Sequence, residues 1–135
     1  MERMGAGVAP TAQKLVHPDQ IKAAKAVVDR IHVDPRVKDY VVDLVFATRE
    51  PERAGLRELV DYIEYGASPR ASIYLLKAAK AHAFLRHRGY VTPDDVKAVG
   101  FDVLRHRVTL TYEAEAEELT SEKIVQKIFD RIEVP

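Results

Sequence analysis

The chain of 135 residues has no cysteine, few glycines, no net charge and no long apolar run. Without cysteine, disulfide bonds and thiolate metal sites are excluded, which fits a protein of a reducing compartment. Basic and acidic residues number 21 each, so there is no overall basic field for nucleic acid or anionic lipid. No segment approaches the roughly 18 apolar residues of a membrane span, and the N-terminus lacks a secretory apolar region. These absences predict a soluble, cytoplasmic protein without a nucleic-acid partner.

The sequence also lacks the motifs on which nucleotide hydrolysis and zinc chemistry depend. A P-loop needs glycines that bring backbone N–H groups to the phosphates, then Lys with Ser or Thr, and a later strand that ends in an Asp for magnesium. None of the six glycines stands in that arrangement, and Gly5 and Gly7 are followed by no third glycine of a dinucleotide fingerprint. The five histidines form no HExxH motif, so we predict structural or surface roles for them and no metal site. The chain alone is therefore predicted not to hydrolyse ATP.

Enough apolar residues are present for one folded domain. They make up 47% of the chain and charged residues 31%, which is an ordinary globular composition. Residues 1–14 combine Gly, Ala and Pro without periodicity, and we interpret them as a flexible linker. The folded domain is predicted to cover residues 15–135.

Apolar residues recur at helical spacing in five segments of that domain. They predict helices over about residues 19–31, 35–48, 69–87, 93–104 and 121–132. Asp34 and Thr92 each precede a proline, and Thr120 precedes the last segment, which are start signals for a helix. Gly89 is expected to stop the third helix.

The segments between the helices differ in character. Residues 50–67 hold apolar side chains that must be buried, so they are predicted to form a structured connection. Residues 107–111 alternate β-branched residues as a short strand does. Four glutamates could hold a cation or act in acid–base chemistry, but a solvated linker is favoured because no partner group surrounds Glu113, Glu115, Glu117 and Glu118. The expected fold class is mainly α, a small helical bundle with at most a short two-stranded β element.

The third predicted helix contains the most unusual local feature. Its apolar face is expected to include Ile73, Leu76, Ala79, Ala83 and Phe84. Ser68 is expected to cap the helix and Pro69 to open it, yet the next residue is Arg70. A cation in the first turn opposes the helix dipole by roughly 0.3 to 1 kcal/mol. Because helix N-termini bind anions, these residues make sense as half of a phosphate site; the alternative is a plain surface arginine or an intramolecular salt bridge.

Three stretches in order resemble a known family. They are VDRIHVDPRVKDYVVDLVFATR, then YGASPRASIYLLKAAKAHAFLRHRGYVTPDDVKAV, then VLRHRVTLTYEAEAEELTSEKIVQKI. Together they look like the C-terminal lid domain of the MoxR family of AAA+ ATPases, and the resemblance covers about residues 15–135. The combination of GASPR, an Ala-rich helix and YVTPDDV is much more specific than GASPR alone.

The resemblance implies a nucleotide site. In such a family the arginine of GASPR is the sensor-2 residue, which reaches the γ-phosphate of ATP held with Mg²⁺ on the P-loop domain, and in this sequence that residue is Arg70. The turn that presents it would be shaped by Gly66, Ala67, Ser68 and Pro69. The family also places the first lid helix near the adenine, so base or ribose packing is implied for Val37, Tyr40 and Val41. Core packing explains the same apolar stripe.

The resemblance also implies partners. The P-loop domain is not in this chain, so ATP would be held by the same or a neighbouring subunit of a ring oligomer, and lid motion would drive chaperone-like remodelling of a client protein. Whether Arg70 acts in cis or in trans stays open, as does the client. Two alternatives remain: a stand-alone helical adaptor that docks a partner helix, and a helix-turn-helix DNA binder, against which the zero net charge counts.

Overall fold

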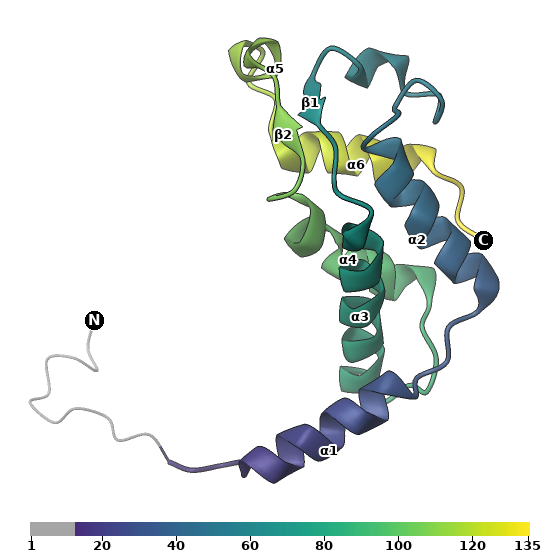
Figure 1. Cartoon of the computed structure of the whole chain (residues 1–135), viewed down its shortest axis with the longest axis vertical. Helices are drawn as coiled ribbons and strands as arrows, with labels where there is room; N and C mark the ends of the chain where they lie inside the picture. Colours follow the sequence, from purple (N-terminus) through teal and green to yellow (C-terminus); the bar gives the residue numbers. More distant parts are fainter. Residues whose placement is uncertain (1–12) are drawn as a thin grey trace, which may run out of the picture.

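The computed structural model describes residues 13–135 (Figure 1), so the predicted linker over residues 1–14 lies, except for its last two residues, outside the described range. The described residues form six α-helices, one 3-10 helix and a two-stranded antiparallel sheet. In chain order these are α1 (Pro18–Asp29), α2 (Pro35–Ala47), η2 (Arg57–Leu59), β1 (Ile63–Tyr65), α3 (Arg70–Leu85), α4 (Pro93–Leu104), β2 (Thr109–Leu110), α5 (Tyr112–Ala116) and α6 (Ser121–Arg131). The predicted mainly α fold class is confirmed, as is the short two-stranded β element.

The helices pack around a single apolar core. Figure 1 shows α3 through the centre with α4 beside it, and these two helices make the most extensive contact in the domain. α2 lies along one flank, and α6 crosses near the end that carries β1 and β2. Side chains with no exposed area come from α2, η2, α3, α4 and α6, among them Leu44, Leu59, Leu75, Leu104, Ile124 and Ile128. Burial of each such side chain stabilises the fold by about 1.5–3 kcal/mol.

The starts of α2 and α6 are where the sequence signals place them. Asp34 caps α2, and its carboxylate accepts a hydrogen bond from the Arg36 backbone N–H at 2.9 Å. Thr120 caps α6 and accepts from the Lys123 N–H at 3.3 Å. None of the helices in residues 13–135 is long and apolar enough to cross a membrane.

The end of α3 differs from the expectation. The helix ends at Leu85, and His87, not Gly89, takes the left-handed conformation, with φ of 56°. The His87 N–H donates to the carbonyl of Phe84, and the Arg88 N–H donates to the carbonyl of Ala83, both at 2.9 Å. These two bonds form a Schellman motif, which a residue other than glycine adopts at some cost.

The start of α4 is tied to the end of α3 through a buried carboxylate. Asp95 is 1% exposed, and its oxygens accept hydrogen bonds from the Arg88 guanidinium at 2.7 and 2.5 Å and from the Thr92 N–H at 2.8 Å. The Nδ1 atom of His82 lies 2.7 Å from the same carboxylate. Burial alone would raise the pKa of Asp95, but the hydrogen bonds outweigh it and hold that pKa well below its ordinary value. Asp95 thus joins the two central helices.

The acidic stretch after β2 is a helix, so its interpretation as a linker is wrong. The Thr111 hydroxyl accepts from the Ala114 N–H at 3.3 Å, which caps α5, and Ala114 itself is fully buried. Glu118 ends the helix with φ of 54°. The expectation that these glutamates are solvated holds, since they are exposed, and residues 13–135 contain no cluster of three ligands that could hold a metal ion.

α1 packs less than any other long helix. It is a helix as predicted, yet none of its residues is buried, and Ile21 and Val27 are 52% and 41% exposed. Its C-terminal end is held against α3, where the Lys80 ammonium donates to the carbonyl of Asp29 at 2.8 Å. In Figure 1 α1 extends from the end of the domain opposite to β1 and β2.

Candidate functional site

The GASPR turn, residues 66–70, leads from β1 into α3 and lies against the end of α2. A Cβ atom built at Gly66 would stand 2.2 Å from the carbonyl oxygen of Thr48 and 2.7 Å from the Cα of Arg49. Both are backbone atoms, which cannot swing aside as a flexible side chain would. Gly66 is therefore required by the close approach of two backbone segments.

Hydrogen bonds fix the next residue of the turn to the same place. Thr48 is fully buried, and its hydroxyl donates to the carbonyl of Val45 at 2.7 Å while accepting from the Ala67 N–H at 2.9 Å. The Arg49 guanidinium donates to the carbonyl of Ala67 at 3.3 Å. Ala67 is itself fully buried, so both of its backbone polar groups and its side chain anchor the turn to α2.

Substitution Gly66→Ala is expected to destabilise the chain by about 1–3 kcal/mol, because the added methyl group must push the turn away from Thr48. Chemical denaturation measures this loss directly. Gly89→Ala is the matched control, since nothing lies within 4 Å of a Cβ built at Gly89. Equal stability of the two variants would contradict the anchoring role of Gly66.

Beyond the anchor, the turn starts α3. The helix begins at Arg70, so Pro69 holds the cap position and the predicted cap, Ser68, lies one residue earlier. The carbonyl of Ser68 nevertheless accepts from the Ala71 N–H at 2.7 Å, and its hydroxyl accepts from the Arg70 N–H at 3.4 Å. The difference from the prediction is within the usual uncertainty of a helix boundary.

Arg70 is exposed in the first turn of α3. Within residues 13–135 its guanidinium forms no hydrogen bond and no salt bridge, and no acidic residue occurs in the sequence from Tyr65 to Pro93. The intramolecular salt bridge considered as an alternative is therefore not formed in the described part of the chain. The anchored turn thus presents the planar, permanently charged guanidinium of Arg70 at the positive end of a helix dipole. This arrangement suits the binding of an anion.

The residues expected to pack against a base lie in the core instead. Val37, Tyr40 and Val41 are 5%, 2% and 2% exposed. Burial raises the pKa of Tyr40 to about 12, with a smaller contribution from the charge of Asp94, and the tyrosine hydroxyl has no hydrogen-bond partner within residues 13–135. Core packing accounts for these three side chains, so they do not belong to the site that we describe.

The exposed side of α2 carries apolar residues that the sequence reasoning missed. Val42 and Phe46 are 53% and 37% exposed and line a pocket of about 230 Å³. The remaining lining residues come from the end of α2 and from the GASPR turn and α3, namely Val45, Arg49, Pro69 and Ser72. The available signal was the spacing of positions 42, 46 and 49 on the helix face opposite to the core stripe. An apolar hollow therefore lies beside the turn that bears Arg70.

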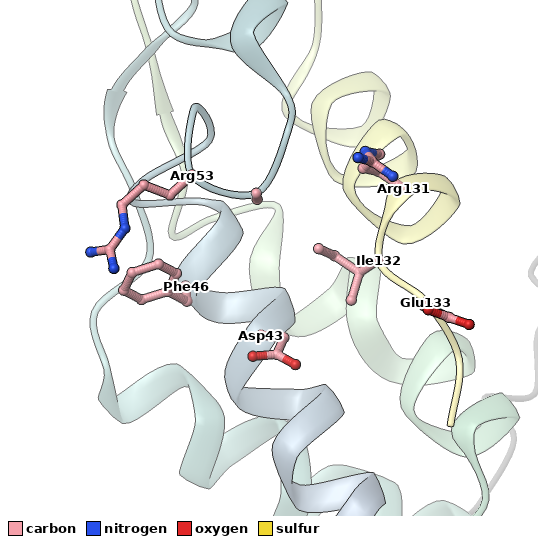
Figure 2. Close-up of a pocket in the computed structure, with 7 residues that line it drawn as sticks. Asp43, Phe46, Arg53, Arg131, Ile132 and Glu133 are labelled. Atoms are coloured by element: carbon pink, nitrogen blue, oxygen red, sulfur yellow. The ribbon is translucent and has the colours of Figure 1, made fainter.

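A larger hollow, of about 450 Å³, lies between α2, the loop that follows it and the end of α6, as Figure 2 shows. Its charged groups are balanced, with two acids, Asp43 and Glu133, and two arginines. Arg53 is paired with Glu50 at 2.7 Å and stacks over Phe46 at 5.3 Å. Because this balance selects no ligand of either sign and Arg70 does not line the hollow, we place the candidate site at the GASPR turn.

Comparison with known proteins identifies the family of the chain. The family described as the AAA lid domain matches residues 60–128, just over half of the chain, and includes the GASPR turn. The chain is 38% identical to the chaperone MoxR1 of Mycobacterium tuberculosis over 133 residues, which is 98% of this chain and 35% of the relative. It is 31% identical to the protein MoxR of Methylorubrum extorquens over 118 residues, 83% of this chain and 34% of that protein.

A solved structure is also similar to this chain. A candidate ATPase from Cytophaga hutchinsonii superposes with a TM-score of 0.94 at 37% identity, covering 100% of this chain and 41% of that one. The chain thus spans about a third of the length of the curated relatives that it matches. The chain belongs to the AAA lid domain family, in the form found in MoxR-type AAA+ proteins.

Proposed function

We propose that this chain is the lid of a MoxR-type AAA+ ATPase and that Arg70 contacts the γ-phosphate of ATP. The nucleotide is held on a P-loop domain of the same or a neighbouring subunit, and we call this chain together with that domain the full-length protein. The observation that carries the proposal is the exposed guanidinium of Arg70, without a partner in residues 13–135, at the N-terminus of α3.

Electrostatics explain why an arginine suits this position. Without a ligand, the cation opposes the helix dipole by roughly 0.3 to 1 kcal/mol. A γ-phosphate would be attracted both by the cation and by the positive end of the dipole, and each charge-assisted hydrogen bond to it contributes about 1.5–3 kcal/mol. The anchors at Gly66 and Ala67 hold the turn in place, so little ordering is needed when the phosphate arrives.

The chemistry of the residues near the turn assigns binding positions to the other parts of the nucleotide. The apolar pocket lined by Val42 and Phe46 adjoins the same turn and suits the base or ribose, while Ser68 and Pro69 shape the phosphate side. Mg²⁺ is assigned to the P-loop domain, as the resemblance to the family implies. When bound, that ion neutralises charge on the phosphates.

The lid is proposed to couple the nucleotide state to remodelling. A contact that exists with ATP and is lost with ADP gives the lid two orientations, which is the differential interaction that a conformational switch requires. In a ring oligomer such motion would act on a client protein, in keeping with the name chaperone carried by the relative from Mycobacterium tuberculosis.

Binding measurements test the γ-phosphate contact without turnover. In the full-length protein, Arg70→Ala is expected to weaken binding of a non-hydrolysable ATP analogue by about tenfold to a hundredfold, since one charge-assisted hydrogen bond or more is lost. Affinity for ADP should change by less than about twofold, because ADP has no γ-phosphate. Isothermal titration calorimetry gives both constants.

Arg86→Ala is the matched control for this measurement. Arg86 is also exposed and also lies at an end of α3, but at the C-terminal end, where it is the cap residue. The control should bind both nucleotides as the unsubstituted protein does. If Arg70→Ala weakens the binding of ADP and of the ATP analogue equally, Arg70 does not contact the γ-phosphate.

A second candidate function, a helical adaptor, is favoured by one observation. α1 and the residues before it leave Leu15, Val16 and Ile21 exposed at 86%, 56% and 52%. Such a group of exposed apolar side chains on and before a helix is typical of docking to a partner protein. Titration of this chain with its P-loop domain and with client proteins separates the two functions, because only the lid function requires the P-loop domain.

A further inference from the structure

We infer that the free edge of the small sheet binds an extended segment of a partner protein that carries Lys or Arg side chains. The surface for this segment, which we call the acidic end, consists of residues 58–65 and 108–118. These two ranges contain β1, β2 and α5, and Figure 1 shows them together at one end of the domain. Binding there requires neither Arg70 nor a nucleotide, so it is a function additional to the one proposed above.

The sheet of the acidic end has unused edges. Among residues 13–135, β1 and β2 form a sheet of two strands and pair only with each other. Each strand therefore has one edge whose backbone N–H and C=O groups join no ladder. In Figure 1 β2 lies at the margin of the molecule, on the side of β1 that faces away from α2. An extended peptide can add to such an edge as a third strand, and its main-chain hydrogen bonds supply the affinity.

Hydrogen bonds hold this end of the domain in order. The Thr111 N–H donates to the carbonyl of Tyr62 at 3.1 Å, and the Thr111 hydroxyl donates to the carbonyl of Asp61 at 2.8 Å. The Tyr62 hydroxyl donates to the carboxylate of Glu117 at 2.8 Å. These three bonds connect the segment before β1 with α5. A bound segment therefore meets a surface that needs little further ordering.

Large apolar side chains are exposed at the acidic end. Val60, Tyr65 and Tyr112 are 44%, 66% and 81% exposed. Tyrosine is enriched at protein interfaces because its ring offers apolar area and its hydroxyl offers a hydrogen bond. A partner that covers these side chains removes apolar area from water, which favours binding.

The charge of the acidic end selects the kind of partner. The chain has no net charge, yet residues 58–65 hold three acidic side chains, residues 108–118 hold four, and neither range holds Lys, Arg or His. The two arginines that border these ranges are engaged elsewhere: Arg57 pairs with Glu52 at 2.9 Å, and Arg107 stacks over the Tyr74 ring at 5.4 Å. Such a surface is complementary to a basic segment. A second copy of the lid would bring carboxylates against carboxylates, which disfavours pairing of two free edges.

A hollow beside the sheet suits one side chain of the basic segment. It has a volume of about 470 Å³ and is lined by Asp61, Tyr62, Glu113 and Glu117. Three of these four residues carry carboxylates, and no cation lines the hollow. A Lys or Arg side chain can lay its apolar stem along the wall and direct its charge to the carboxylates.

A defined peptide tests binding to the full-length protein. The probe is a fluorescein-labelled peptide of about ten residues in which valine alternates with lysine, the pattern of an extended strand. Fluorescence anisotropy at low ionic strength should give a Kd of about 10–100 µM. The same peptide with glutamate in place of lysine should bind at least about tenfold more weakly. Equal binding of the two peptides, or a Kd above about 1 mM for the lysine peptide, would overturn the inference.

Methylation of the peptide backbone separates strand addition from attraction of charges alone. In a strand, the main-chain groups of alternate residues bond to the same neighbouring strand. One peptide is methylated at the backbone nitrogens of its valines and another at those of its lysines, so each loses the donors of one edge. One of the two should bind at least about tenfold more weakly than the unmethylated peptide, because several hydrogen bonds are lost. If both bind as the unmethylated peptide does, no strand is added and the inference is wrong.

Charge reversal locates the site on the lid. Glu64→Lys and Glu113→Lys replace exposed side chains of the acidic end, and each should weaken binding of the lysine peptide by about threefold to tenfold. Glu133→Lys is the matched control, because it makes the same change in net charge at an exposed position just after α6. The control should change the affinity by less than about twofold. Equal effects of all three variants would show that overall charge, and not the acidic end, attracts the peptide.

Photo-cross-linking then shows where the peptide lies. A benzoylphenylalanine replaces one valine of the lysine peptide, the complex is irradiated, and the adducts are mapped by mass spectrometry. Adducts within residues 58–65 or 108–118 are expected. Adducts only on the P-loop domain, or only on other parts of the lid, would contradict binding at the sheet edge.

Discussion

Substitution Arg70→Ala in the full-length protein is expected to lower ATP turnover by at least about a hundredfold, because a positioned cation stabilises charge that develops on the transferred phosphoryl group. The loss should appear in kcat as well as in kcat/KM, since the charge is greatest in the transition state. Steady-state measurement of phosphate release provides both values.

The same substitution should leave the fold intact. Arg70 is exposed and has no partner within residues 13–135, so no folded-state interaction is lost. Removal of a cation from a helix N-terminus relieves roughly 0.3 to 1 kcal/mol of unfavourable dipole interaction, so the melting temperature should be equal or slightly higher. A variant that is inactive because it unfolds would show a clear decrease.

Arg70→Lys separates the effect of charge from that of hydrogen-bond geometry, because lysine keeps the positive charge but lacks the planar guanidinium. We expect turnover between that of the unsubstituted protein and that of Arg70→Ala. Unchanged turnover in Arg70→Ala would show that Arg70 takes no part in hydrolysis.

Substitution Asp95→Asn is expected to cost the chain about 3 kcal/mol of stability, because a buried carboxylate that pairs two helices loses its charge. The Arg88 side chain is 27% exposed and keeps some contact with water, which puts the cost at the lower end for a broken buried pair. The His82 and Thr92 hydrogen bonds to the carboxylate are weakened at the same time. Urea denaturation at neutral pH measures the difference.

Asp94→Asn is the matched control for this variant. Asp94 precedes Asp95 in the first turn of α4 but is exposed, so its substitution should change stability by less than about 1 kcal/mol. Equal losses from the two substitutions would show that the helix dipole, and not the buried pair, accounts for the effect.

The pH dependence of stability is an independent test of the stabilising role of the Asp95 carboxylate. Its pKa is lowered in the folded state, so the unfolded chain binds the proton more tightly. The stabilisation is therefore present above the unfolded pKa of about 3.9 and is lost as the pH falls towards the folded pKa. The Asp95→Asn variant should lose less stability on acidification than the unsubstituted chain.

Local chemistry made most of the fold predictable. Caps such as Asp34 and Thr120 act through hydrogen bonds to residues two or three positions away, so their effect can be recognised in the sequence alone. The same holds for Arg70, whose unusual place after Ser68 and Pro69 was visible without coordinates.

Features that depend on tertiary packing were not predictable. α3 is rich in alanine and carries apolar residues on most sides, so its sequence does not indicate which side faces the core, and Ile73 was misplaced. The burial of Asp95 depends on where Arg88 lies after a left-handed turn at His87, a conformation rare outside glycine. The pocket that Val42 and Phe46 line could be recognised only once α3 was placed beside α2, because Pro69 and Ser72 complete its lining.

The contact between Arg70 and the nucleotide is tested most directly by a structure of the full-length protein with Mg²⁺ and a non-hydrolysable ATP analogue. The account predicts a guanidinium nitrogen of Arg70 about 2.7–2.9 Å from a γ-phosphate oxygen, in the same or a neighbouring subunit. An Arg70 side chain that points into solvent, or that pairs with a carboxylate while the γ-phosphate is bound elsewhere, would contradict it.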